Sequence, residues 1–436
     1  MEHEAPVSSN EAPGPTPATD PLTMAVALDK TNLQSALSRV IANKGAAGVD
    51  GMTVDELPDY LWRAWPTIRP QLLDGHYKPQ PVKRVYIPKP DGGQRALGIP
   101  TVLDRFIQQA LLQVLSPQWE PTFSDHSFGF RPGRSAHQAV ERAQGYITEG
   151  HGWVVDIDLE KFFDRVNHDM LMGRVMKRVS DMRIVRLIRA YLNAGVMENG
   201  LVSSSGGEGT PQGGPLSPLL SNLVLDDLDK ELESRGHKFV RYADDCNIYV
   251  RTERAGQRVM KGISDFITRK LKLKVNTSKS AVDRPGRRKF LGFSFTFGSK
   301  PKRRIAPKAT EKMKKRVREL TRRTRGVDAK RMVETLSVYL RGWIGYFGHC
   351  QTPSVLDALD SWIRRRLRAV AWKQWKRGKR RFKELRRRGV GKDLAAQTAG
   401  SVHNVWRISR SPAMSIALPN RLWERLGLPK LSAGVR

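Results

Sequence analysis

Apolar residues recur at helical spacing in several stretches of the chain, and each stretch begins with a residue that favours a helix N-terminus. Thr101 with Asp104, and Ser135 with Gln138, each place a hydroxyl and an acid or amide three residues apart, which satisfies the first backbone amides of a helix. A serine followed by proline opens another helix at Ser217. The pattern predicts helices over 101–115, 135–143, 217–232 and near 257–271.

Other stretches alternate between apolar and polar residues, as strands do. In WVVDIDL at 153–159, three apolar side chains ending with Leu159 face one way, and Asp156 and Asp158 face the other. A strand, a Gly-Gly turn and a second strand are predicted within 82–100, and a further strand over 288–297. The strand at 153–159 therefore presents two carboxylates on one face.

The last third of the chain returns to helical spacing. Apolar stripes over 313–320, 332–347 and 356–370 predict three amphipathic helices with basic outer faces, which imply a small bundle. From residue 376 the chain is basic and then mixed, and 410–428 is its only clear folded segment. The first 27 residues have the proline- and acid-rich composition of a disordered tail. The expected fold class is α+β, followed by a helical region.

Two adjacent carboxylates, Asp244 and Asp245, interrupt a strand-like run in RYADDCNIYV at 241–250. Because neighbouring side chains of a strand point to opposite faces, a regular strand would send one acid into the core. A hairpin with both acids at its tip is therefore expected. On these ten residues alone, an acidic surface turn explains the pair. The other interpretation is half of a metal site, which needs a third carboxylate.

Asp158 is the candidate for that third carboxylate, since its strand and the hairpin tip can meet at one edge of a sheet; Asp156 faces the same way and stays an alternative. Two Mg²⁺ ions need several shared oxygen ligands to offset their mutual repulsion, and Mg²⁺ favours a few carboxylates plus substrate phosphates. Such a site suits phosphoryl transfer, which depends on positioning and charge neutralisation. Lys89 and Arg95, beside the Gly-Gly turn, could hold a triphosphate.

The charge of the chain points to a polyanionic partner. The 436 residues carry 76 Lys and Arg against 43 Asp and Glu, a net charge of +33, and thirty basic against seven acidic residues fall between 300 and 388. Aromatic residues interleave with the basic ones there, which is typical of nucleic-acid binding.

No apolar stretch approaches the ~18 residues of a membrane span. The first 29 residues contain no Lys or Arg, unlike a signal peptide. The only cysteines, Cys246 and Cys350, give neither a disulfide framework nor a paired-cysteine zinc site, so an intracellular protein is expected.

FVRYADDCNIYV resembles the YADD box of reverse transcriptases, and other segments resemble the remaining blocks of that family in the right order. These segments are IPKPDGGQRALGIPT, FSDHSFGFRPGRSAHQAV, WVVDIDLEKFFDRVNHD, GTPQGGPLSPLLSN, LKLKVNTSKS and RKFLGFSF. NKGAAGVDGMT, LRGWIGYF and SRSPAMSIALPNRLWERLGL resemble the N-terminal block, the maturase region and the C-terminal DNA-binding segment of group II intron reverse transcriptases. The chain is identified as a member of that family, most similar to its compact bacterial class C.

The resemblance implies roles for individual residues. The family's metal aspartate begins the D-x-x-x-x-F-D spacing, which selects Asp158 over Asp156, and the backbone carbonyl of Leu159 shares the metal. Asp244 is the second ligand, with Asp245 beside it. Other implied roles are a gate against the ribose 2′-hydroxyl for Phe163, a place beside the incoming nucleotide for Gln212, triphosphate binding for Lys89 and Arg95, and proton donation to pyrophosphate for Lys279. The residues assigned to nucleic-acid binding are Arg131, Arg134, Gly213, Gly214, Arg364, Arg365 and Arg366. The plain alternatives are a core phenylalanine at 163 and a solvated lysine at 279.

The resemblance also implies an architecture and an activity. It implies a right-handed polymerase with fingers and palm over 28–299, a helical thumb or maturase region over 300–375 and a basic DNA-binding module over 376–436. The expected activity is RNA-directed DNA synthesis with two Mg²⁺ ions and dNTPs, on an RNA template with a DNA primer or target DNA. The expected partner is a structured group II intron RNA, whose splicing and retrohoming the protein assists in the bacterial cytoplasm, near the nucleoid and without a membrane.

Three other functions fit parts of the pattern. A maturase that only assists splicing would have no need of Asp158, Asp244 and Asp245. An RNA-dependent RNA polymerase is disfavoured by Phe163 and by Ala243, where those enzymes typically carry glycine. A domesticated reverse transcriptase of a defence system is disfavoured by the maturase and C-terminal segments. Because no paired cysteines follow the maturase region, the zinc-associated HNH-type nuclease of longer relatives is not expected.

Overall fold

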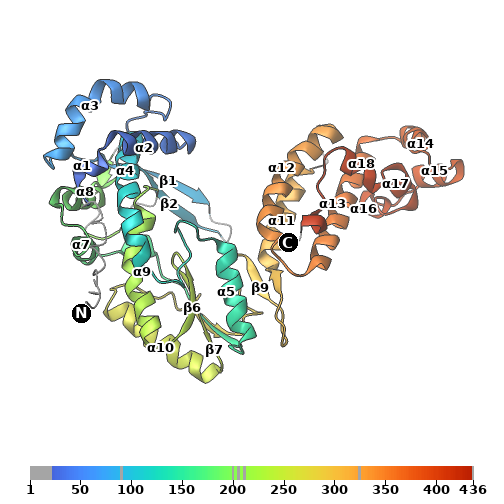
Figure 1. Ribbon diagram of the computed structural model, residues 1–436. Helices are drawn as coiled ribbons and strands as arrows, with labels where there is room; N and C mark the ends of the chain where they lie inside the picture. The colour runs from blue at the N-terminus through green and yellow to red at the C-terminus, as the bar shows by residue number, and fades with distance from the viewer. Residues whose placement is uncertain are drawn as a thin grey trace, which may run out of the picture. The chain divides into compact units, whose positions relative to one another are not determined.

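The chain folds into two compact units, each built from segments that are far apart in the sequence (Figure 1). The computed structural model describes residues 22–88, 92–198, 201–203, 207–209, 213–322 and 326–434. Unit 1 consists of Met1–Ser124, Glu160–Leu228 and Arg269–Lys274, and unit 2 consists of Asp125–Leu159, Asp229–Thr268 and Val275–Arg436. Each unit contains a four-stranded sheet, and the helical C-terminal region belongs to unit 2.

A mixed sheet with the strand order β2-β1-β4-β5 organises unit 1. Its strands are β1 (Val82–Pro88), β2 (Gln94–Ile99), β4 (Val196–Glu198) and β5 (Leu201–Ser203). β1 and β2 form the predicted antiparallel hairpin, in which Ile87 lies opposite Arg95. Gly92 and Gly93 precede β2 with φ values of 90° and 78°, a backbone conformation that favours glycine. β1 also pairs in parallel with β4, so the hairpin and a much later segment share one sheet.

The helices of unit 1 confirm the apolar pattern of the sequence. They are α1 (Met24–Ala27), α2 (Lys30–Ala42), α3 (Leu57–Leu73), α4 (Val102–Trp119), α6 (Phe162–Arg165), α7 (His168–Met176), α8 (Met182–Asn193) and the first part of α9 (Ser217–Ser234). Thr101 caps α4 as predicted, accepting from the amide of Asp104 at 3.1 Å. Phe106, Ile107 and Leu111 of the predicted stripe are buried.

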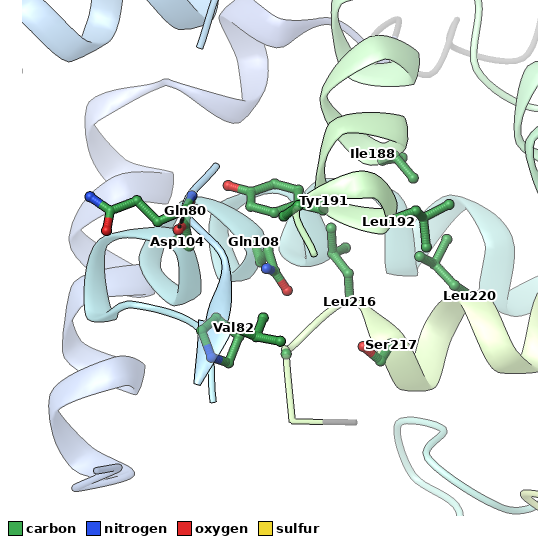
Figure 2. A pocket seen from close by; sticks show the side chains of 13 residues that line it. Gln80, Val82, Asp104, Gln108, Ile188, Tyr191, Leu192, Leu216, Ser217 and Leu220 are labelled. Carbon is green, nitrogen blue, oxygen red and sulfur yellow. Dashed lines mark hydrogen bonds between the residues drawn. The ribbon is translucent and has the colours of Figure 1, made fainter. Parts of the chain in front are cut away.

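A small cavity of about 20 Å³ lies beside α4, and the side chains of Asp104, Gln108 and Tyr191 are drawn around it in Figure 2. Asp104 accepts hydrogen bonds from Thr101 Oγ1 at 2.7 Å and from the Tyr77 hydroxyl at 2.9 Å. Burial nevertheless raises the pKa of Asp104, because these hydrogen bonds offset only part of the lost hydration. The cavity has room for about one water, so it is a structural feature of the unit and not a substrate site.

The N-terminal tail predicted over residues 1–27 is too long. Residues 1–21 lie outside the described part of the chain, but Leu22, Met24 and Ala27 are buried in unit 1. Thr23 caps α1 through its side chain, and the amide of Met24 donates to Asp181 Oδ2 at 2.7 Å. The apolar residues that follow the proline-rich stretch are therefore part of the fold. The prediction included them in the tail because they follow a long stretch of proline and acidic residues without Lys or Arg.

An antiparallel sheet with the order β6-β7-β3-β8 forms the first part of unit 2. Its strands are β3 (Trp153–Ile157), β6 (Lys238–Tyr242), β7 (Asp245–Val250) and β8 (Ala281–Asp283). β6 and β7 form the predicted hairpin, and β3 pairs with β7 on one side and with β8 on the other. The strand that carries Asp156 and leads to Asp158 therefore lies directly beside the strand that begins at Asp245.

The two faces of this sheet contact different helices. Val154, Val240 and Tyr249 share one face and a core cluster with α5 (Ala136–Thr148). On the other face, a Cβ added to Gly256 of α10 (Glu253–Arg269) would lie 2.5 Å from Val282 Cγ1. Strand alternation and the observed register place Asp156 and Asp245 on the α5 face. Both acids thus lie on the same face.

The three helices predicted after residue 309 are present in unit 2 (Figure 1). They are α11 (Pro307–Leu320), α12 (Ala329–Phe347) and α13 (Pro353–Gln374). A short hairpin of β9 (Phe293–Phe295) and β10 (Arg303–Ile305) precedes them, so the strand predicted over 288–297 is shorter than expected. This hairpin spans the domain boundary proposed at 299/300. Among the described residues, no helix is both long and apolar enough to cross a membrane.

The segment after residue 376 is more folded than the sequence predicts. It forms α14 (Gly378–Arg387), α15 (Lys392–Ala399), α16 (Val405–Ile408), α17 (Pro412–Ala417) and α18 (Asn420–Arg425). Leu385, Val390 and Ala395 are completely buried and belong to one hydrophobic cluster with α11, α12 and α13. These few apolar residues are scattered among many basic ones, which is why 410–428 alone looked folded.

Three of the tryptophans among the basic residues of this region are more buried than the prediction implies. Trp343, Trp372 and Trp375 are buried in the hydrophobic cluster and are not presented to a polyanion. The guanidinium of Arg381 lies 4.6 Å from the ring centroid of Trp372, and that of Arg388 lies 5.3 Å from the ring centroid of Trp375. The alternation of tryptophan and arginine therefore builds cation–π contacts at the edge of the core.

Candidate active site

The two adjacent carboxylates lie at the turn of the β6–β7 hairpin, which confirms the prediction. Tyr242 pairs with Asp245, so Ala243 and Asp244 form the turn. Ala243 has a φ of 56°, a left-handed conformation that costs about 1–2 kcal/mol for a residue with a Cβ. Strained backbone of this kind clusters at functional sites. Asp244 is half-buried and Asp245 is exposed, so the turn presents both acids at one end of the sheet.

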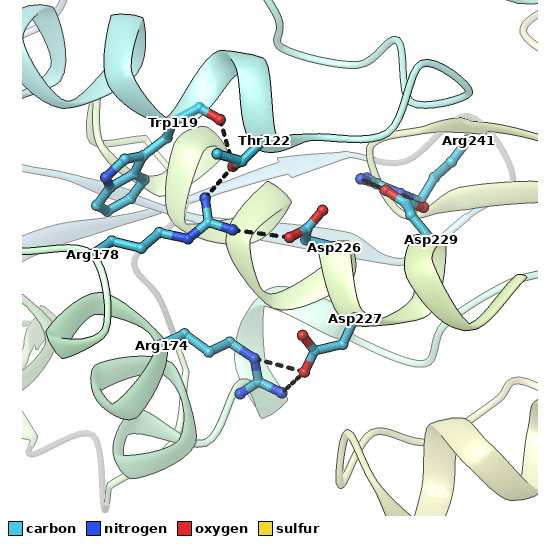
Figure 3. Close-up of polar contacts among 8 residues, drawn as sticks. All are labelled: Trp119, Thr122, Arg174, Arg178, Asp226, Asp227, Asp229 and Arg241. Atoms are coloured by element: carbon cyan, nitrogen blue, oxygen red, sulfur yellow. Dashed lines mark hydrogen bonds and ion pairs between the residues drawn. The ribbon is translucent and has the colours of Figure 1, made fainter. Parts of the chain in front are cut away.

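Arg241 supports this turn from inside the protein. Its guanidinium donates to both carboxylate oxygens of Asp229 on α9, from Nε at 2.7 Å and from Nη2 at 2.6 Å, and both side chains are fully buried (Figure 3). Its Nη1 donates to the backbone carbonyl of Ala243 at 2.9 Å. The two-pronged ion pair fixes the guanidinium plane, and the third hydrogen bond holds the turn.

A neighbouring segment of unit 2 packs directly against the same turn. The amide of Phe128 donates to the carbonyl of Arg241 at 2.8 Å, and the amide of Arg241 donates to the carbonyl of His126 at 2.9 Å. A Cβ added to Gly129 would lie 2.2 Å from the amide nitrogen of Ala243. The segment can approach the turn this closely only because residue 129 is glycine.

The third predicted carboxylate, Asp158, follows β3 and is anchored through its backbone. Its amide donates to Ser280 Oγ at 3.0 Å, and its carbonyl accepts from the amide of Asn276 at 2.8 Å. The Asp158 carboxylate remains partly exposed, and Oδ2 lies 3.9 Å from Lys279 Nζ. Leu159 is buried and forms a β-bridge with Val275. The loop that carries Lys279 is therefore tied to the backbone of Asp158.

Asp156 and Asp158, which the sequence pattern alone leaves as alternatives, have different partners. Arg288 donates to Asp156 Oδ2 from Nε at 2.9 Å and from Nη2 at 2.6 Å. The same Nη2 donates to the carbonyl of Lys279 at 2.6 Å. Asp156 is thus neutralised by an arginine, whereas among the described residues the Asp158 carboxylate has one salt-bridge contact, the long one with Lys279. Because a metal ligand needs an available carboxylate, this difference favours Asp158.

The carboxylates repel one another. The pKa of Asp245 is raised to about 7. The largest cause is the loss of hydration near the surrounding protein atoms, although the residue is still exposed to solvent, and the charges of Asp156, Asp244 and Asp158 add to it. A divalent cation would relieve this repulsion, so the chemistry of the donor set fits Mg²⁺. Within the described ranges, no group of three or more His, Cys, Asp or Glu is arranged to hold a metal ion. The carboxylates are close enough to repel one another, but their present positions do not form a complete set of metal ligands.

The residues predicted to contact the nucleotide belong to unit 1, apart from two that lie outside the described residues, Lys89 and Gln212. Arg95 is exposed on β2. Phe163 is buried in α6, with its ring centroid 5.2 Å from that of Phe162 in an edge-to-face contact. This burial agrees equally with a core phenylalanine and with one edge of a nucleotide site.

Gly213 and Gly214 lie where a side chain would clash with neighbouring atoms of the protein. Gly213 has a φ of 137°, and an added Cβ would lie 2.4 Å from the carbonyl oxygen of Gly98. A Cβ on Gly214 would lie 2.4 Å from Gln108 Oε1. Both glycines thus allow a close approach of their backbone to β2 and α4 of unit 1, and the predicted contact with nucleic acid stays a prediction.

The arginines predicted to bind nucleic acid make contacts within the protein. Arg131 is buried and donates to the carbonyl of Ser127 at 2.9 Å, and Arg134 pairs with Asp125 at 2.6 Å. Arg365 donates to the carbonyl of Trp406 at 2.9 Å. Arg366 Nε donates to Thr321 Oγ1 at 2.8 Å. Replacing Arg364, Arg365 and Arg366 together would therefore remove packing contacts as well as charge.

The residues that sequence reasoning missed are Arg241, Asp229, Gly129 and Arg288. One signal in the sequence was the acidic run of α9, which consists of Asp226, Asp227 and Asp229. In the structure each of these acids pairs with an arginine: Asp226 with Arg178 at 2.9 Å, Asp227 with Arg174 at 2.6 Å, and Asp229 with Arg241 (Figure 3). The arginine inside RYADD was another, since a charge within a buried strand must be paired. The partner of each arginine depends on tertiary structure and could not be named.

Two family models match the chain. Residues 87–295 match reverse transcriptase (RNA-dependent DNA polymerase), and residues 310–389 match the maturase-specific domain of group II introns. The first match begins within β1 and ends with β9, so it includes the carboxylates beside β3 and at the β6–β7 turn. The second begins within α11 and includes α12, α13 and α14.

Similar proteins carry the same two themes. Protein YkfC of Escherichia coli is 42% identical over 209 residues, 47% of this chain and 55% of that protein. Group II intron-encoded protein LtrA of Lactococcus lactis is 39% identical over 207 residues, 47% of this chain and 34% of that protein. The chain therefore spans about half of YkfC and a third of LtrA. A solved chain of apo telomerase from Candida tropicalis has a TM-score of 0.41 with 14% identity, covering 52% of this chain and 55% of that one, a likeness too low to support an argument.

Proposed function

Because the chain belongs to the group II intron family of reverse transcriptases and maturases, we propose that it copies RNA into DNA and binds its own intron RNA. In this proposal it assists splicing, and retrohoming by target-primed reverse transcription. The observation that supports the polymerase activity most is the position of Asp158, Asp244 and Asp245 around the neighbouring strands β3 and β7, within the segment that matches reverse transcriptases. Three carboxylates placed close together around paired strands cost free energy unless cations neutralise their charge.

We assign the metal to the carboxylates at the ends of β3 and of the β6–β7 hairpin. Asp158 and Asp244, with Asp245 and the carbonyl of Leu159, would hold two Mg²⁺ ions, which when bound neutralise charge at the primer 3′-hydroxyl and the triphosphate. Arg241 keeps the turn in place from the protein interior through the Ala243 carbonyl. The chain's own contribution is thus a fixed turn beside an anchored strand end.

Lys279 is proposed to give a proton to the departing pyrophosphate. Its Nζ lies 3.9 Å from Asp158 Oδ2, so the exposed ammonium is already beside the proposed metal ligand. Arg288 positions the lysine by donating to its backbone carbonyl while pairing with Asp156. Asp156 therefore acts through Arg288 and Lys279 and not as a metal ligand. On the nucleotide side, Lys89 and Arg95 are proposed to bind the triphosphate, with Gln212 beside the base.

The proposed activity is tested by primer extension. The purified chain should extend a DNA primer annealed to an RNA template when dNTPs and Mg²⁺ are supplied, and should make no product when Mg²⁺ is chelated. Failure to extend, in a folded preparation that still binds the template, would favour the maturase that only assists splicing. An RNA-dependent RNA polymerase would instead require rNTPs.

Replacement of Phe163 by Val tests the sugar gate. If the ring excludes the ribose 2′-hydroxyl, the smaller side chain should admit rNTPs and lower the preference for dNTPs by roughly 10- to 100-fold, while dNTP incorporation continues. The measurement is the ratio of kcat/KM for dNTP and rNTP in single-nucleotide extension. Phe162→Val, which changes the neighbouring buried ring, is the matched control. An unchanged ratio in an active Phe163→Val enzyme would assign the ring to the core alone.

Replacement of Gly129 by Ala tests the packing of the turn. Because the added methyl group would lie 2.2 Å from the Ala243 amide, the turn must move, and displacement by about 1 Å costs ~100-fold in rate. We expect extension to fall by that factor while RNA affinity stays within about twofold. Gly145→Ala in α5, where the added Cβ meets nothing within 4 Å, should extend primers at the wild-type rate. Equal rates in the two variants would show that the turn tolerates displacement.

The maturase assignment applies to the helical region that follows. We propose fingers and palm over 28–299, a thumb or maturase bundle over 300–375 and a DNA-binding module over 376–436, with intron RNA and target DNA as partners. The thirty basic residues between 300 and 388 support binding to nucleic acid. Arg131, Arg134 and Arg364–Arg366 remain proposed contacts, although most already have partners within the protein.

Bacterial relatives favour a cytoplasmic, nucleoid-associated location. Sequencing the RNA that copurifies tests the compact class C type against a role in a defence system: a class C intron RNA would support the first.

A further inference from the structure

A basic cavity lies at the end of the β6–β7 hairpin that is remote from the carboxylates. It has a volume of about 560 Å³ and is open to solvent, and residues of β6, β7, α10 and the loop before β3 line it. Six of the lining residues are basic or imidazole side chains: His151, Arg235, His237, Lys238, Arg251 and Arg258. No Asp or Glu is among the residues that line it. All of these residues belong to unit 2.

Part of the charge of this cavity has no ionic partner inside the protein. Arg235 pairs with Glu231, and Lys238 Nζ lies 6.0 Å from the ring centroid of Tyr146. Within the described residues Lys238, Arg251 and Arg258 have no salt-bridge partner. All three side chains belong to exposed residues. Burial, and secondly the charge of Arg235, lower the pKa of His237, so its ring is neutral and can donate or accept a hydrogen bond at physiological pH. Unpaired cations that converge on a hollow are suited to an anion.

The cavity is separate from the carboxylate site. Lys238 pairs with Tyr249 at one end of the hairpin, and Tyr242 pairs with Asp245 at the other. Four residues of strand separate the two ends, about 13 Å at ~3.3 Å per residue. A nucleotide held at the carboxylates therefore cannot place its phosphates in this cavity. A volume of this size is typical of a site for a nucleotide-sized group.

We propose that this cavity is a second phosphate-binding site, with Arg251, Arg258 and Lys238 as its cationic groups. Arginine matches phosphate with two parallel hydrogen bonds, and lysine adds a point charge. The phosphate belongs to an RNA backbone that passes across the open cavity, or to a free nucleoside triphosphate that enters it. The site does not depend on the polymerase reaction, so Asp244→Asn should leave it intact.

The test compares two variants that each remove two positive charges from the same segment. Arg251→Gln with Arg258→Gln removes two of the three arginines that line the cavity and leaves Arg235, which pairs with Glu231. Arg254→Gln with Lys261→Gln, exposed residues of the same helix that do not line the cavity, is the matched control. Because all four side chains are exposed, both variants should unfold at the wild-type temperature. One probe is a fluorescein-labelled single-stranded RNA oligonucleotide, followed by anisotropy over a series of KCl concentrations, and the other is a fluorescent ATP analogue.

We expect the cavity variant to bind the RNA about tenfold more weakly than the control. Its log–log salt slope should be shallower by about 1.4, since each phosphate contact of a single strand contributes ~0.7. Weaker RNA binding with wild-type binding of the ATP analogue assigns the phosphate to the RNA backbone. Weaker binding of the ATP analogue alone assigns it to a free nucleotide. If the cavity variant and the control bind both probes equally, the cavity is not a phosphate site.

Discussion

Asp244→Asn is expected to abolish detectable cDNA synthesis while the protein remains folded. Asparagine keeps the size of the side chain but removes one charge from the site proposed to hold two divalent ions. Each ~1.4 kcal/mol added to the barrier lowers the rate tenfold, and loss of a metal ligand adds several kcal/mol, so the rate should fall at least ~1,000-fold. The measurement is single-turnover primer extension on an RNA template.

Stability gives this prediction its control. Asp244 lies at a half-buried turn, and neutralising it removes repulsion from Asp245, so Asp244→Asn should not lower the unfolding temperature. Asp357→Asn, an exposed acid on α13, is the matched substitution and should leave synthesis unchanged. Asp156→Asn should be milder than Asp158→Asn, because Asp156 pairs with Arg288 and acts through Lys279. The reverse order would assign the metal to Asp156.

Asp229→Asn is expected to destabilise the protein by about 3–5 kcal/mol. The substitution leaves the fully buried guanidinium of Arg241 without its anion, and breaking one side of a buried pair costs this much. Asp227→Asn, two residues earlier on α9, makes the same chemical change in a pair whose acid is 46% exposed. That control should cost at most about 1 kcal/mol. Urea unfolding of the two variants measures the difference.

A double variant separates stability from positioning. Asp229→Leu with Arg241→Met removes both buried charges, and an apolar pair of similar volume is often as stable as the ion pair. The double variant also lacks the hydrogen bond to the Ala243 carbonyl, so its cDNA synthesis should stay low even where stability recovers. Full synthesis by a stable double variant would show that the turn holds itself in place and that Arg241 serves stability alone.

Local patterns predicted the elements of the site well. The alternation of WVVDIDL predicted β3, and the doubled acid within a strand-like run predicted the β6–β7 turn, because strand periodicity forbids both acids in a regular strand. The choice between Asp156 and Asp158 came from resemblance, and the physical reason appears only in the structure. Arg288 reaches Asp156 from a loop more than a hundred residues away, and periodicity has no information about such a contact.

Charged composition concealed other parts of the fold. In α14 and α15 the core is made by Leu385, Val390 and Ala395 among a dense run of basic residues, so the apolar pattern is too sparse to predict burial. The tryptophans near them looked available to nucleic acid, yet they are buried with arginines against their faces. Sequence shows that aromatic and basic residues alternate, but only packing decides whether the rings face the core or a ligand.

The central claim is that the carboxylates serve DNA synthesis and that other surfaces bind RNA. The most direct measurement takes one preparation of the Asp158→Asn, Asp244→Asn double variant and assays both cDNA synthesis and splicing of the intron RNA that copurifies with the wild-type protein, at low Mg²⁺. The account predicts no cDNA and splicing within about twofold of wild type, with an unchanged unfolding temperature, since the folding contacts to RNA come from basic residues. Wild-type cDNA synthesis by this variant, or loss of splicing in a properly folded preparation, would contradict it.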